Sequence, residues 1–126
     1  MDIRYSANPQ DVKRYTTEEL RREFLIESLF RPGELTAVYS HVDRMVTMGC
    51  MPAGAAVSIE QGIDVWASFG TRFFLERREA GLFNLGGPGR VTVDGTVYPM
   101  DYKDCLYITR GAKEVLFSSD DPAAPA

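Results

Sequence analysis

The stretch that decides the fold reads Val91-Thr92-Val93-Asp94-Gly95-Thr96-Val97-Tyr98. β-Branched residues alternate with other side chains on both sides of an Asp-Gly pair, and Asp-Gly tolerates the positive φ angles of a two-residue type I′ turn. The stretch therefore predicts a tight antiparallel hairpin.

Short runs rich in Val, Ile, Tyr, Phe and Thr continue on both sides of this hairpin, with Gly, Pro and Asp between them. Runs of this composition are typical of antiparallel sheet. Two further reversals are marked by Gly86-Gly87-Pro88-Gly89 and by Thr109-Arg110-Gly111-Ala112. We predict an all-β sandwich or small barrel. The expected strands are residues 35–40, 44–48, 55–59, 72–75, 82–85, 90–93, 96–99, 105–109 and 114–117.

The amino-terminal region has a different pattern. Thr16 and Glu19 have the spacing of a capping box, which predicts a short helix that continues to Phe24. The apolar residues between Phe24 and Phe30 fit a helix and a strand about equally well, and Pro32-Gly33 ends either one. We expect residues 1–119 to form one domain and residues 120–126, which lack large apolar side chains, to be a frayed tail or the start of a linker.

Composition narrows the possible partners. A chain of 126 residues with 44% hydrophobic and 25% charged residues is typical of one globular domain. Fourteen basic and eighteen acidic residues give a net charge of −4, which argues against a nucleic-acid partner. The sequence has no long apolar run and no secretory signal, so we expect a cytoplasmic protein without a membrane partner. Cys50 and Cys105 are expected to be buried free thiols.

The order of strands and turns from Phe73 to Phe117 resembles a cupin, a small antiparallel β-barrel of the jelly-roll type whose two motifs usually carry metal-binding histidines. Glu79 and Gly86 have the spacing of the first motif, but no histidine precedes that glutamate. The second motif resembles the stretch from Lys103 to Gly111, with Glu114 at the position of the remaining histidine. The resemblance thus implies a cupin-like domain without metal ligands.

Four segments are similar, in order, to 5-keto-4-deoxyuronate isomerases, and together they extend over most of the chain. The resemblance implies the amino-terminal half of an isomerase that interconverts 5-dehydro-4-deoxy-D-glucuronate and 3-deoxy-D-glycero-2,5-hexodiulosonate during the degradation of pectin and other polyuronides. It implies that zinc is bound by a second cupin half, which follows this one. The amino-terminal half is then structural and binds no cofactor, and the enzyme is a homo-oligomer. The segments are Arg22-Glu23-Phe24-Leu25, Val38-Tyr39-Ser40-His41-Val42-Asp43-Arg44, Phe74-Leu75-Glu76-Arg77-Arg78-Glu79 and Gly111-Ala112-Lys113-Glu114-Val115.

His41 is the only histidine, so a three-histidine zinc site cannot form within one copy of the chain. Isomerisation needs a base to move protons and an electrophile to stabilise the developing negative charge. His41 is a candidate proton shuttle, with Glu76 or Glu79 as further acid-base candidates. The favoured interpretation of a lone histidine is structural, with a hydrogen bond to Asp43 or to the backbone that fixes a turn.

Arginine binds carboxylates through two parallel hydrogen bonds, so Arg77 and Arg78 are candidates for binding the uronate. A salt-bridge role between domains or subunits is favoured over this one, and an exposed strand end is the third interpretation. Lys113 is a further binding candidate, either paired with Glu114 inside the barrel or simply exposed. Alternation predicts that Val115 and Phe117 point inward and Glu114 outward.

Three functions remain open from the sequence. The chain is part of an enzyme whose zinc-bearing half lies elsewhere in the polypeptide, or it is a stand-alone metal-free cupin that binds a uronate or a related sugar, or it is an assembly module. Calorimetry with a uronate separates the second function from the others.

Overall fold

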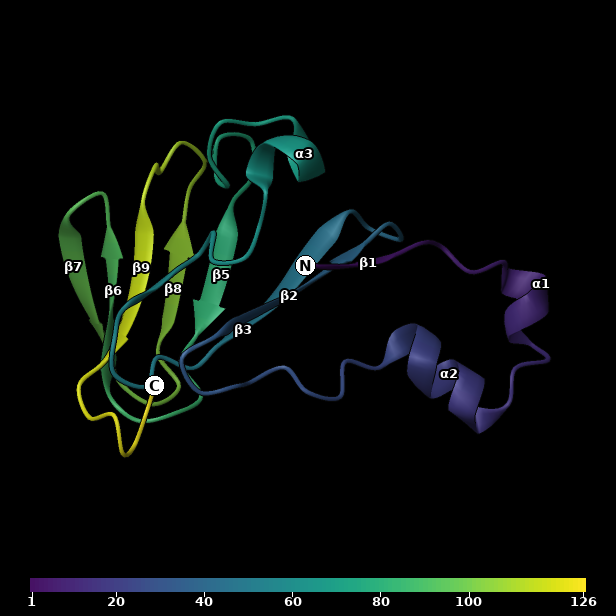
Figure 1. Ribbon diagram of the computed structural model, residues 1–126, viewed down its shortest axis with the longest axis horizontal. Coiled ribbons are helices and arrows are strands. Elements are labelled where there is room, and N and C mark those ends of the chain that lie inside the picture. Colours follow the sequence, from purple (N-terminus) through teal and green to yellow (C-terminus); the bar gives the residue numbers. More distant parts are fainter.

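The computed structural model describes residues 1–126 (Figure 1). Most of the ordered backbone is sheet, as predicted, and three short helices accompany it. The helices are α1 (Pro9–Val12), α2 (Thr17–Phe24) and α3 (Val65–Phe69). The strands are β1 (Asp2–Arg4), β2 (Leu35–Ser40), β3 (Met45–Cys50), β4 (Val57–Ser58), β5 (Ala80–Phe83), β6 (Gly89–Val93), β7 (Thr96–Met100), β8 (Cys105–Ile108) and β9 (Val115–Ser119).

The strands form three sheets, in the orders β1-β2-β3, β4-β9-β6-β7 and β5-β8. All pairings are antiparallel except the short parallel contact between β1 and β2. An all-β fold is therefore confirmed. The three sheets are not joined into one closed barrel, because no ladder connects β3 to β5 or β7 to β8. The cupin-like jelly roll stays a prediction.

The predicted hairpin connects β6 and β7. Asp94 and Gly95 have φ angles of 46° and 83°, which are the positive values of a type I′ turn. The Asp94 carboxylate also accepts hydrogen bonds from the backbone N–H groups of Lys113 and Glu114, both at 2.9 Å. One side chain thus fixes the turn and the beginning of β9 together.

The core lies between the β4-β9-β6-β7 sheet and the chain segments that cross it. Leu75 and Val115 are the most completely buried side chains, each with 1% of its surface exposed, whereas Glu114 is exposed. The predicted inward orientation of Val115 is confirmed. The other members of the central cluster are Ile59, Val65, Phe74, Val91, Met100 and Ile108.

The predicted amino-terminal helix is confirmed as α2, with Thr16 and Glu19 forming the expected capping box. Residues 25–31, which follow α2, form neither helix nor strand. A single β-bridge comes directly after them, at Pro32. Helices α1 and α2 project to one side of the sheets, at the purple end of the chain (Figure 1). None of residues 5–31 is buried.

Two predictions are wrong. Residues 72–75 form turns rather than a strand, because the Glu76 carboxylate accepts hydrogen bonds from the backbone N–H and the guanidinium of Arg72 and so closes the chain on itself. Cys105 is exposed and Cys50 is half-buried, although both were predicted to be buried. Cys105 lies on the outward face of β8, opposite Phe83 of β5.

Three short elements were missed from the sequence, namely β1, α1 and α3. The tail folds back on the body, since Gly87 N–H donates to the carbonyl of Pro125 at 2.9 Å and Ala126 N–H donates to Ser119 Oγ at 2.8 Å. A side chain at Gly86 would meet the Pro125 carbonyl oxygen at 2.3 Å, so this contact needs glycine. None of the helices has the length and apolar character needed to cross a membrane.

Replacement of Asp94 tests how strongly the turn is fixed. Asp94→Ala removes both hydrogen bonds. It also places at positive φ a residue that has no side-chain acceptor. We therefore expect it to lower the free energy of unfolding by about 2 kcal/mol. Asp94→Asn keeps an acceptor oxygen and tolerates the left-handed conformation, so it should lose less than half of that. Urea unfolding followed by circular dichroism measures both, and equal stability of the alanine variant and the parent chain would contradict the assigned role.

Candidate functional site

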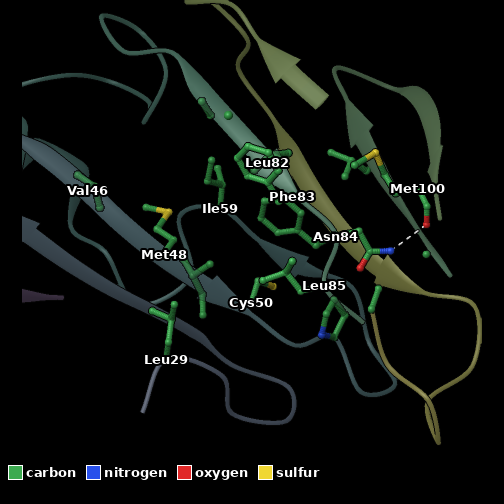
Figure 2. A pocket seen from close by; sticks show the side chains of 18 of the residues that line it. Leu29, Val46, Met48, Cys50, Ile59, Leu82, Phe83, Asn84, Leu85 and Met100 are labelled. Carbon is green, nitrogen blue, oxygen red and sulfur yellow. Dashed lines mark hydrogen bonds between the residues drawn. The ribbon is translucent and has the colours of Figure 1, made fainter. Parts of the chain in front are cut away.

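A cavity with a volume of about 670 Å³ lies between β3 and β5, with β6 behind it (Figure 2). Seventeen of its 26 lining residues are hydrophobic, so its walls offer few hydrogen bonds to a sugar. Figure 2 shows Val46, Met48 and Cys50 on one side, facing Ile59, Leu82 and Phe83. Burial raises the pKa of the Cys50 thiol to about 12, which keeps this group neutral.

Asn84 is the buried amide in the cavity wall. Its Nδ2 donates to the carbonyls of Met100, at 3.0 Å and drawn in Figure 2, and of Gly87, at 2.8 Å. Its Oδ1 accepts from the N–H of Gly86 at 3.1 Å. The hydrogen bonds of this amide hold the backbone around β6, and both of its N–H groups are used, so it has no free donor for a ligand.

Charged side chains lie at the margin of the cavity. The Arg78 guanidinium lies over the Phe69 ring at 4.3 Å and near the Tyr39 ring at 5.5 Å, and it donates to the carbonyl of Arg44 at 3.1 Å. Stacking on two aromatic rings holds the cation in place. Neither Arg44 nor Arg78 has a carboxylate partner.

Glu79, at the same margin, accepts a hydrogen bond from the hydroxyl of Tyr107 at 2.5 Å. This bond, with a smaller contribution from burial and from the negative charge of Glu79, raises the pKa of Tyr107. The pairing of Ala80 with Ile108 brings the two residues together. The sequence alone did not predict the contact of Tyr107 with Glu79, because it depends on which strands pair.

His41 is exposed and lies among aromatic rings. Its imidazole stacks on Tyr5 at 4.7 Å and meets the edge of Tyr39 at 4.9 Å, while its backbone N–H donates to the carbonyl of Arg4 at 2.9 Å. The structure shows no hydrogen bond between His41 and Asp43. His41 and Arg78 are brought together only through Tyr39, which both side chains contact.

The other predicted site residues do not converge on the cavity. Glu76 is paired with Arg72 at 2.8 Å, and the hydrogen bond from the Arg72 backbone N–H, followed by those from its side chain, lowers the pKa of Glu76. Arg77 is exposed and makes no ion pair. Lys113 is exposed, and its backbone N–H is the group that Asp94 holds.

The residues do not fit a zinc site. Catalytic zinc needs about three His, Cys or carboxylate ligands that converge on one point. No group of three or more His, Cys, Asp or Glu side chains gathers in this way.

The contact between Glu79 and Tyr107 predicts a pH effect. Because Tyr107 has a raised pKa when folded, the contact stabilises the fold below the ordinary tyrosine pKa, and this stabilisation is lost as the pH rises through the raised value. Glu79→Ala should return the pKa of Tyr107 toward its ordinary value, whereas Glu76→Ala should leave it unchanged. Carbon-13 NMR titration of the tyrosine ring measures both, and a raised pKa that persists in Glu79→Ala would contradict this cause.

The comparisons with known proteins agree over the full length. The chain is 46% identical to the 4-deoxy-L-threo-5-hexosulose-uronate ketol-isomerase of Lachnoclostridium phytofermentans and 48% identical to that of Halalkalibacterium halodurans; each match covers 100% of the chain and 44% of the relative. A third relative, from Pectobacterium carotovorum subsp. carotovorum, is 45% identical, again over all of the chain and 45% of the relative. No family model matches the chain. The chain thus spans less than half the length of these curated relatives, and it belongs to their ketol-isomerase family as the counterpart of their amino-terminal part.

Proposed function

We propose that this chain is the amino-terminal cupin part of a zinc-dependent uronate ketol-isomerase, and that this part supports the enzyme without carrying its metal centre. The observation that carries the proposal is the match of the whole chain to 44% of relatives named for this activity, in a chain that has no convergent set of metal ligands. The proposed partner is the carboxy-terminal part of the same enzyme. A cytoplasmic location stays a prediction.

The arrangement of the sheets supports the cupin assignment. The β4-β9-β6-β7 sheet and the β2-β3 hairpin enclose an apolar interior between them, and β5-β8 lies along the same interior (Figure 1). An antiparallel jelly roll whose hairpin has splayed outward has these features. In the proposed enzyme the interior is packed, or covered by another part of the assembly.

The chemistry also supports a structural role. Moving a carbonyl along a sugar chain requires a base and an electrophile that stabilises the developing negative charge. Glu79 is hydrogen-bonded to Tyr107, Glu76 is paired with Arg72, and Arg78 is stacked on Phe69. The other candidates, His41, Arg77 and Lys113, are exposed and do not line the cavity. The proposal therefore assigns the electrophile, a zinc ion, to the other part of the enzyme.

An activity assay tests the proposal. We expect no turnover of 5-dehydro-4-deoxy-D-glucuronate by the isolated chain, and turnover when the chain is joined to the carboxy-terminal part of the Lachnoclostridium phytofermentans relative. The carboxy-terminal part alone is the control for the contribution of this chain. The joined protein with the zinc ligands of that part replaced should be inactive.

Turnover by the isolated chain that survives a chelator would refute the assignment of the chemistry to the absent part. In that case His41, Glu76 and Glu79 would be the first residues to replace. Saturable binding of a uronate to the isolated chain, measured by calorimetry without turnover, would instead favour the stand-alone sugar-binding module.

A further inference from the structure

The segment of residues 121–126 turns back after β9 and lies against the body of the chain (Figure 1). Asp121 closes the turn, because its carboxylate accepts a hydrogen bond from the backbone N–H of Ala123 at 2.8 Å and its carbonyl accepts one from that of Ala124 at 3.1 Å. The residues after the turn then return to the loop before β6. The segment therefore has a fixed path back into the structure.

Three glycines in this loop and at the start of β6 leave space for the returning residues: Gly86, Gly87 and Gly89. A Cβ at Gly87 would overlap the carbonyl oxygen of Ala124. A Cβ at Gly89 would lie 2.6 Å from the Cβ of Ala126. None of the three glycines has a positive φ angle, so glycine is required here by the close approach of the chain and not by the backbone conformation. Together they form a groove that fits residues 124–126.

The groove places the end of the segment in the wall of the cavity between β3 and β5. Ala126 lines this cavity, together with Gly89, Ser118 and Pro52. The backbone N–H of Ala126 donates to Ser119 Oγ at 2.8 Å, and the same hydroxyl donates to the carbonyl of Pro52. One serine thus ties the segment to the chain that follows β3. The segment forms an end wall of the cavity, separate from the open side between β3 and β5.

This end wall is held mainly by hydrogen bonds. Beyond Asp121 the segment contains only Pro and Ala, which bury little apolar surface, and residues 121–124 are exposed. Asp120 is tied to the body separately, since its N–H donates to the carbonyl of Pro88 at 3.0 Å and its carboxylate pairs with Arg90 at 3.0 Å. A segment with few buried apolar contacts opens at a low free energy. The segment can therefore open from Asp121 onward while β9 stays paired.

We propose that residues 121–126 form a strap that closes this end of the cavity and opens as a unit, with its hinge directly after Asp120. When the strap is docked, Ala126 separates the apolar interior from solvent at this end. When it is released, apolar groups gain a second way into the cavity, past Ser118 and Pro52. The strap thus sets how readily an apolar compound reaches the interior. This role does not depend on the proposed isomerase activity.

Hydrogen exchange followed by NMR tests whether the strap opens as a unit. The amide of Gly87, which donates to the carbonyl of Pro125, and the amide of Ala126 report on the two ends of the contact. Both should exchange at similar rates, at least about tenfold faster than the core amide of Ile59, which donates to the carbonyl of Val115.

Two variants release the strap from opposite sides. Gly87→Ala puts a methyl group where the strap lies, and Ser119→Ala removes the hydroxyl that holds Ala126. If the strap opens as a unit, each variant should speed exchange at the distant contact at least about tenfold, at Ala126 for Gly87→Ala and at Gly87 for Ser119→Ala. Gly81→Ala is the matched control, because Gly81 lines the same cavity and a Cβ there would meet nothing within 4 Å. It should leave both exchange rates unchanged.

Stopped-flow fluorescence with 1-anilinonaphthalene-8-sulfonate measures access to the cavity. Both releasing variants should bind this dye at least about threefold faster than the parent chain, because association is slowed when it must wait for a conformational change. Near-ultraviolet circular dichroism must stay as in the parent, which separates an open strap from loosened packing. Strap amides as protected as that of Ile59 would overturn the proposal. So would exchange that changes only beside the substitution, an equal effect of Gly81→Ala, or dye association that release of the strap leaves unchanged.

Discussion

The pairing of β6 with both β7 and β9 is the constraint on which the rest of the structure depends. Val91 of β6 lies opposite Tyr98 on one side and Phe117 on the other, so this strand brings the hairpin and the carboxy-terminal strand into one sheet. Asp94 locks the same arrangement at one end, because its carboxylate holds the start of β9. Val115 of β9 and Leu75, which belongs to the same core cluster, are the most buried side chains in the chain. This sheet therefore positions the residues that form the rear wall of the cavity.

The opposite wall of the interior is held less tightly. β2 and β3 pair with each other, and only the short strand β1 extends their sheet, so the edge of β3 faces the edge of β5 without a ladder between them. An apolar interior with an open side results, since Val46 and Met48 point into it from β3 (Figure 2). The same opening explains why charged residues gather only at its margin. A polar sugar would form few hydrogen bonds with such walls, whereas burial of apolar side chains from another protein segment against them would be favourable.

Local signals in the sequence were sufficient for several elements. The range of β2 was predicted from a short run of strand-forming residues, α2 from its capping box, and the β6–β7 turn from Asp94-Gly95. The prediction of a strand at residues 72–75 was wrong. A short apolar run does not show that Arg72 and Glu76 pair and so form a turn. Helix α3 had readable end signals in Asp64 and Gly70, but it is only one turn long. The contacts of Glu79 with Tyr107 and of Arg78 with Phe69 join distant segments, so no local pattern contains them.

The resemblance to uronate isomerases rested on four short segments, and the full-length identity to named relatives now supports it independently. We propose, as the central claim, that this part of the family scaffold folds without a metal and that the metal chemistry belongs to the rest of the enzyme. Elemental analysis of the purified chain, combined with circular dichroism before and after chelation, tests this claim most directly. The account predicts background metal only and an unchanged spectrum in chelator. One tightly bound zinc ion per chain, whose removal unfolds the protein, would contradict it.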